Sequence, residues 1–167
     1  SGLFDMFKYC SVGTGTTAPA NGQTSLVSSI ASVQKSSSSN SNLGSPTYAA
    51  QYNSVYTFSQ GAVTGNIAEF GVGWASGGGS LFSRCLIVDN SGSPTTLTLT
   101  SINQLTIYYR LTLTPSLVDV TGTVSLSSIN YSYTARLANA NTFFSANGDF
   151  DNWNGGSMSP FSGIQDA

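Results

Sequence analysis

Histidine is absent from this 167-residue chain, Glu69 is its one glutamate, and charged residues make up only 7% of the sequence. Ordinary globular domains carry about 25% charged residues, so the groups that acid–base and metal chemistry need are scarce here. Five Lys plus Arg stand against seven Asp plus Glu, with no cluster of either sign. We therefore expect no enzyme, no cofactor, no metal, and no binding to nucleic acid or to a membrane surface.

Long apolar runs are also missing. No stretch approaches the roughly 20 apolar residues of a spanning helix, and no basic segment precedes a short apolar one as in a secretory signal. The two cysteines, Cys10 and Cys85, lie far apart in the sequence. Their spacing is compatible with two reduced thiols and also with one disulfide, and it excludes a disulfide framework.

What the chain does have is hydroxyl groups and aromatic rings. It contains 29 Ser and 18 Thr, and its 40% hydrophobic residues include eight Tyr and nine Phe. That apolar content is enough to build a packed core and argues against disorder. The length corresponds to about one domain.

Alternation of apolar and polar residues is the main structural signal. Residues 105 to 113 place Leu and Ile on one parity and Thr and Arg on the other, which is typical of a strand with one buried face. A second strand is expected at about 51 to 59, where tyrosines share one parity. Valines at 118 to 124 and tyrosines at 131 to 133 predict two more strands, with a turn or bulge near 127 to 130.

Two other segments carry strand and turn signals. Residues 81 to 100 predict two strands across a turn at Asp89 to Pro94, the strongest local hairpin signal in the chain. Gly71 and Gly73 interrupt an apolar run, which indicates a bulge or a close approach of backbone.

One helix is expected. Leu26, Ile30 and Val33 recur at helical spacing near residues 24 to 35, with Thr24 or Ser25 as the N-cap and Lys35 at the end. The serine-rich residues 36 to 42 that follow predict a solvated loop or linker.

Together these patterns predict an all-β protein, an antiparallel, jelly-roll-like β-sandwich with one short helix near residues 24–35. We expect an N-terminal anchor, helix and Ser-rich loop at 1–45 and the sandwich core at 46–136. The Asn-, Ser- and aromatic-rich tail at 137–167 is expected to pack on the core or on a neighbouring chain through residues such as Phe143, Phe144 and Trp153.

Few residues suggest a reactive or binding site, and each has a structural interpretation that we favour. Gly13-Thr14-Gly15 and Gly71-Val72-Gly73 lack the rest of any phosphate-binding motif. Asp149 and Asp151 lack the remaining calcium-loop ligands. Glu69 and Arg84 are expected to pair across strands and stabilise a sheet.

Aromatic side chains suggest a second kind of surface. The tyrosines could form a carbohydrate-stacking face, although core and interface packing is the interpretation that we favour for most of them. The candidates are Tyr48, Tyr52, Tyr56, Tyr108 and Tyr109.

Three segments resemble a group of tailed-bacteriophage virion proteins, the tail or tail-fibre proteins. They are FKYCSVGTGTTAP at 7 to 19, YTFSQGAVTGNIAEFGVGW at 56 to 74 and LFSRCLIVDNSGSPTTLTLTSINQLTIYYRLTLTP at 81 to 115. The resemblance spans residues 3 to 115, and the third segment is its most specific part. Because such proteins have further chain before the first motif, and the sequence starts at Ser1 without Met, the resemblance implies a processed or partial product.

The resemblance implies a non-enzymatic, structural role in a virion assembled in the bacterial cytoplasm. Fibre, collar, baseplate and head decoration all remain open as the substructure. The expected partners are other virion proteins and further copies of the chain, and no catalytic, cofactor-binding or metal-binding residue is carried over. The alternatives are a module that binds a host receptor or glycan and, with least support, a polysaccharide depolymerase, which needs a carboxylate pair.

Overall fold

The computed structural model describes residues 6–43, 49–114 and 116–135. Eleven β-strands account for the regular structure of these residues apart from a short 3₁₀ turn at Met6 and Phe7, so the expected all-β class is confirmed. The strands form four sheets with the orders β2-β1-β6-β7, β3-β4-β9, β5-β8 and β10-β11. Contacts divide the chain into two units, one of residues 1–39 and 52–110 and one of residues 40–51 and 111–167.

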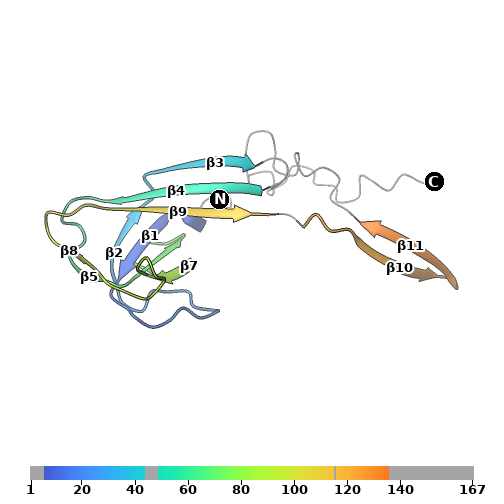
Figure 1. The fold of residues 1–167 in the computed structure, drawn as a ribbon, viewed down its shortest axis with the longest axis horizontal. Helices are drawn as coiled ribbons and strands as arrows, with labels where there is room; N and C mark the ends of the chain where they lie inside the picture. Colours follow the sequence, from blue (N-terminus) through green and yellow to red (C-terminus); the bar gives the residue numbers. More distant parts are fainter. Residues whose placement is uncertain (1–5, 44–48, 115, 136–167) are drawn as a thin grey trace. The chain divides into compact units, whose positions relative to one another are not determined.

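The four-stranded sheet is built around β1 (Tyr9–Gly13) and β6 (Glu69–Gly73), with β2 (Ser29–Gln34) and β7 (Leu81–Leu86) at its edges. All of its pairs are antiparallel. Both central strands are almost fully buried, because the sheet is covered on one face by the core and on the other by the loop that precedes β2 (Figure 1).

A second layer lies over the core of the first unit. It consists of β4 (Ala49–Phe58) and β9 (Leu105–Leu113), flanked by β3 (Ser37–Leu43). Alternate residues of β4 are buried, as the strand predicted at 51 to 59 requires. On β9 the positions with odd numbers are half-buried and Tyr108, Arg110 and Thr112 are exposed, which confirms the predicted two-faced strand.

Aromatic rings fill the space between the two layers of the first unit. The Phe7 ring lies 5.3 Å from Tyr52, 4.9 Å from Phe82 and 5.6 Å from Tyr109, measured between ring centroids. The Tyr56 hydroxyl donates a 2.6 Å hydrogen bond to the Phe7 carbonyl, which satisfies that polar tip inside the core. The antiparallel sandwich expected from the sequence is thus held by a ring cluster joining both sheets.

The helix expected near residues 24–35 is not formed. Leu26 is buried in a loop, and Ser29–Gln34 is strand β2, paired with β1. The physical reason lies in the backbone, since the Val27 and Ser28 N–H groups are held by Glu69 and the following residues pair with β1. Helical spacing of three apolar residues in a short, Ser-rich segment is too weak a preference to compete with these contacts.

The Ser-rich segment 36–42 is also not the loop that the sequence predicts. Ser37–Leu43 forms strand β3 beside β4, and the pairing starts where the Ser36 N–H donates to the Val55 carbonyl at 2.8 Å. Strand pairing uses backbone groups that every serine carries, so an exposed strand needs no apolar side chains. Residues 9–43 therefore contribute strands β1 to β3 where the sequence predicted a helix and a Ser-rich loop.

The turn predicted at Asp89 to Pro94 is present, but the strands beside it pair elsewhere. Asp89 Oδ1 accepts hydrogen bonds from the backbone N–H groups of Ser91 and Ser93, and Val88 forms an isolated bridge with Pro94. Beyond this bridge β7 pairs with β6, while β8 (Leu97–Leu99) pairs with β5 (Gly65–Ile67). The predicted hairpin is therefore correct for its turn and wrong for its strand partners.

The second unit contains a separate hairpin, β10 (Val120–Leu126) and β11 (Ile129–Ala135). Ser127 and Ser128 connect the strands with φ angles of 49° and 67°, so both residues take the left-handed conformation of a type I′ turn. The turn lies within the range 127 to 130 that the sequence predicts. Two-residue turns of this type match the twist of the strands they join.

Candidate functional site

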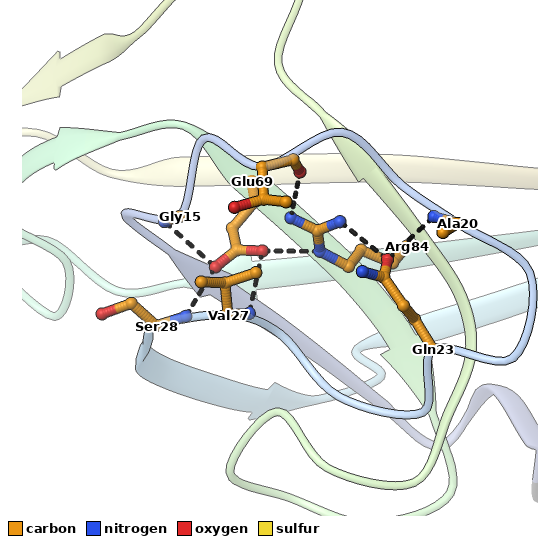
Figure 2. A network of polar contacts seen from close by, with 8 residues as sticks. Gly15, Ala20, Gln23, Val27, Ser28, Glu69 and Arg84 are labelled. Atoms are coloured by element: carbon orange, nitrogen blue, oxygen red, sulfur yellow. Dashed lines mark hydrogen bonds and ion pairs between the residues drawn. The ribbon is translucent and has the colours of Figure 1, made fainter.

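Glu69 is a fully buried carboxylate at the start of β6, and it binds a long loop to the sheet. Its Oε1 accepts hydrogen bonds from the N–H groups of Gly15 at 3.0 Å and Ser28 at 2.8 Å, and its Oε2 accepts one from Val27 at 3.2 Å (Figure 2). Arg84 Nε on β7 donates to Oε2 at 2.7 Å. The expected Glu69–Arg84 pair is thus present, with both side chains almost inaccessible to solvent.

Arg84 extends the same network into the loop. One terminal guanidinium nitrogen donates to Gln23 Oε1 at 3.0 Å and the other donates to the Thr17 carbonyl at 2.8 Å. Gln23 Oε1 also accepts the Ala20 N–H at 3.0 Å. Residues 14 to 28 are therefore attached to the sheet at several points, a set of contacts that we call the Glu69 latch (Figure 2).

The latch keeps Glu69 ionised. Burial by itself would raise the pKa of this carboxyl, but the hydrogen bonds from Ser28, Arg84, Val27 and Gly15 outweigh it and hold the pKa below the ordinary value. A carboxylate with its oxygens occupied by four donors serves as a fixed structural anion. The arrangement supports the structural interpretation of Glu69 and Arg84.

Glycine is needed where the loop passes the carboxylate. A Cβ atom on Gly15 would lie 2.5 Å from Glu69 Oε1, and one on Gly13 would lie 2.3 Å from the Ser28 carbonyl oxygen. The Gly13-Thr14-Gly15 segment thus lets the backbone approach an anion closely, as in a phosphate-binding loop. The anion here is the Glu69 carboxylate of the same chain. Gly71-Val72-Gly73 carries the predicted bulge, because the β6–β7 register shifts between Val72 and Gly73.

The sequence contained little sign of the other members of the latch. Gly15, Val27 and Ser28 act through backbone N–H groups, which every residue but proline has, so no residue type marks them. No pattern in the sequence indicates that Gln23 and the Thr17 carbonyl bind Arg84. Only the rarity of Glu69 and Arg84 in a nearly uncharged chain could have indicated a role.

Both cysteines are free thiols on strands that flank β6. Cys10 lies opposite Val72 and Cys85 lies opposite Phe70. Burial, with a further contribution from Cys85, raises the pKa of Cys10 to about 12, and burial raises the pKa of Cys85 to about 11 against the opposing effect of Arg84. Thiols with such values are protonated and unreactive at neutral pH.

Of the candidate tyrosines, the structure separates those in the core from one at the surface. Tyr52, Tyr56 and Tyr109 pack inside the first unit, whereas Tyr108 is 79% exposed. Tyr48 lies outside the described residues, as do Asp149, Asp151 and the aromatic tail residues at 137–167. Core packing, the use favoured for most of the candidate tyrosines, is thus found for Tyr52, Tyr56 and Tyr109, and the alternative carbohydrate-stacking face is not assembled among the described residues.

Tyr108 borders a groove of about 550 Å³ on the outer face of β4 and β9. The wall also includes Ser39, Asn53 and Arg110. Arg110 Nε donates to Asn53 Oδ1 at 2.7 Å, which fixes the guanidinium beside the exposed ring. The volume is in the range of small-ligand sites.

The two faces of the β10–β11 hairpin differ in polarity. Residues that face each other across the strands are apolar on one face and polar on the other. The apolar pairs are Val120 with Ala135, Gly122 with Tyr133, Val124 with Tyr131 and Leu126 with Ile129. The polar pairs are Thr121 with Thr134, Thr123 with Ser132 and Ser125 with Asn130.

The apolar face of the hairpin is open to solvent. Val120, Val124, Leu126, Ile129, Tyr131 and Tyr133 are each between 49% and 60% exposed. A Cβ on Gly122 would lie 2.5 Å from the Tyr133 hydroxyl oxygen, so the Tyr133 side chain lies across this glycine. Neither strand carries a charged residue.

Comparisons with known proteins identify no relative. No protein-family model, no curated protein and no solved structure matches the chain. Within the described ranges, no three His, Cys, Asp or Glu side chains are grouped so that they could hold a metal ion. In the same part of the chain, no helix has the length and apolar character required to span a membrane.

Proposed function

We propose that the chain is a non-enzymatic structural protein of a tailed-bacteriophage particle, a tail-associated component that forms multimers and attaches to other virion proteins. The observation that carries this proposal is the exposed apolar face of β10–β11. Large contiguous apolar patches on a folded protein mark interaction surfaces, since removing apolar area from water lowers the free energy. The resemblance of residues 3 to 115 to virion proteins supports the particle as the place of assembly.

The chemistry of the rest of the molecule supports the same proposal. The one buried ion pair among the described residues is used to attach a loop, and the free thiols are protonated. A nearly uncharged surface has little electrostatic repulsion between copies. These properties suit durable contact within an assembly.

The test is the location of the chain in particles. Mass spectrometry of gradient-purified particles encoded by the same genome is expected to detect the chain in a fixed ratio to the other structural proteins. Electron microscopy with an antibody against the chain is expected to label the tail. Detection of the chain only among free proteins of the lysate would overturn the proposal.

Host-surface binding is a second function that the Tyr108 groove favours. An exposed ring offers a flat apolar surface for a sugar, while Arg110 and Asn53 offer polar contacts beside it. Saturation-transfer NMR with sialyllactose and lactose is expected to show contact that Tyr108→Ala removes. Trp74→Ala is the matched control, because Trp74 is 50% exposed and does not line the groove. Absence of saturation transfer to either sugar, or equal loss in both variants, would exclude this function.

A further inference from the structure

We propose that the apolar face of the β10–β11 hairpin packs against the same face of a second copy of this chain. The inference rests on the proposed structural role and names the surface and the partner. Face-to-face packing of two hairpins would form a small sandwich of four strands, with the layers about 10 Å apart. The apolar pairs would form its interior and the Thr, Ser and Asn residues would remain in water.

The stability of a hairpin is the first argument for an occupant. A single two-stranded hairpin is at best marginally stable in water, and it gains stability when an apolar face is covered. Thirteen of the fourteen residues in β10 and β11 are exposed in the single chain, so no described segment supplies this cover. Val124 and Tyr131 lie opposite each other on the open face.

The composition of the face selects a second copy over a different partner. No charged side chain in either strand would repel an identical face or call for an opposite charge on it. Interfaces between identical chains are more apolar than those between different ones, and most follow a twofold axis that brings one patch against itself. A face with only Val, Leu, Ile, Tyr, Ala and Gly meets these requirements.

The relief of the face also suits self-packing. Tyr133 lies across Gly122, so the middle of the face contains a flat ring instead of a projecting side chain. Val124 and Tyr131 lie on one side of this ring and Val120 and Ala135 lie on the other. Under a twofold axis, the larger side chains of one copy can therefore pack against the flat Tyr133 ring of the other copy.

The size of the face sets the expected strength. Eight residues, seven of them with a side chain, face the partner, against about 20–30 residues on each side of a standard interface. The hairpin alone therefore supports a concentration-dependent association. Inside a particle, where many copies are held close together, the same contact would be strengthened by high effective concentration.

Adjacent residues of β10 provide a matched pair of variants. Val124→Glu places a charge on the apolar face and Thr123→Glu places the same charge on the polar face, one residue away. Sedimentation velocity of the full chain from about 1 to about 200 µM is expected to show reversible dimers in the wild type. We expect Val124→Glu to weaken association at least about tenfold and Thr123→Glu to leave it within about twofold.

A third variant separates lost association from lost folding. Val124→Thr retains the β-branched shape that strands favour and replaces one methyl group of the face with a hydroxyl. It is expected to weaken association several-fold while far-UV circular dichroism remains that of the wild type. A wild type that stays monomeric throughout the range, or an equal loss in Val124→Glu and Thr123→Glu, would overturn the inference. Either result leaves the presence of the chain in particles to be decided by mass spectrometry.

Discussion

At the scale of single residues, Glu69 shows how a nearly uncharged chain uses a rare charge. The carboxylate is fully buried, yet it accepts hydrogen bonds from three backbone N–H groups and from Arg84. Removal of a charge from water is costly unless such partners replace the water. These donors stabilise the ionised carboxylate, so the latch binds the loop of residues 14 to 28 to the sheet most strongly while Glu69 is ionised.

The first prediction concerns the charge of Glu69. Glu69→Gln retains the side-chain size but leaves the guanidinium of Arg84 buried without its counter-charge. We expect a loss of about 3–5 kcal/mol in the free energy of unfolding, measured by guanidinium chloride denaturation. Asp89→Asn is the control, since Asp89 is exposed in a turn, and its effect is expected to be clearly smaller. Equal stability of Glu69→Gln and the wild type would contradict the latch.

The pH dependence of the same variant gives an independent test. The pKa of Glu69 in the folded chain lies below the ordinary value of 4.5, because the hydrogen bonds favour the ionised form. Its contribution to stability is therefore complete above the unfolded pKa and is lost as the pH falls through the folded pKa. Between about pH 5 and pH 3 the wild type should lose stability more steeply than Glu69→Gln. Parallel curves would show that Glu69 titrates alike in both states.

At the scale of elements, glycines of β6 allow neighbouring strands to approach closely. A Cβ on Gly73 would lie 2.3 Å from the Ser80 carbonyl oxygen and 2.9 Å from Leu81 Cα. Both are backbone atoms, which cannot move aside as a flexible side chain can. The bulge at Val72 and Gly73 therefore depends on the absence of a side chain.

The second prediction compares two glycines of this region. Gly73→Ala is expected to destabilise the fold by about 1–3 kcal/mol, since the added methyl group forces the β6–β7 backbones apart. Gly79→Ala is the control, because no atom lies within 4 Å of the added Cβ. Its stability should be unchanged or slightly raised, through the lower entropy of the unfolded chain. Thermal unfolding measures both, and equal melting temperatures would refute the steric argument.

At the scale of the whole molecule, low charge and exposed apolar strands are the properties on which the proposed self-association depends. The formal net charge is −2 on 167 residues, so long-range repulsion between copies is weak. Contacts between such surfaces derive their free energy from the removal of apolar area from water. Association should therefore respond to solvent conditions as the hydrophobic effect does.

The third prediction is the salt dependence of multimer formation. Sodium chloride screens interactions between exposed charges that lie more than about 10 Å apart at 0.1 M and more than about 3 Å apart at 1 M, but it does not weaken apolar contacts. Multimers of the wild type are thus expected to persist at 1 M sodium chloride and to strengthen in sodium sulfate, which favours burial of apolar surface. Light scattering at constant protein concentration measures the mass. Dissociation by sodium chloride would point to an interface held by charges.

Local patterns in the sequence predicted much of the fold because successive side chains of a strand point to opposite faces, so a strand with one buried face alternates apolar and polar residues. The alternation at 105 to 113, the strand near 51 to 59 and the turn near 127 to 130 are all found. The predictions of a helix near 24–35 and of a Ser-rich loop were wrong, since both segments have only weak local preferences for one type of secondary structure. Partners far away in the sequence decided their structure, namely β1 and Glu69 for residues 27 to 34 and β4 for β3.

The sequence by itself determined the all-β class, the two-faced strands and the scarcity of reactive groups, because composition and alternation are properties of neighbouring residues. Only the tertiary structure decided that β7 pairs with β6 and β8 with β5. It also decided that Glu69 meets three backbone N–H groups and that no described segment covers the apolar face of β10–β11. Every residue except proline carries the same backbone N–H group, so no residue type marks the partners of Glu69. The burial of a strand depends on which other segments pack against it, and these are distant in the sequence.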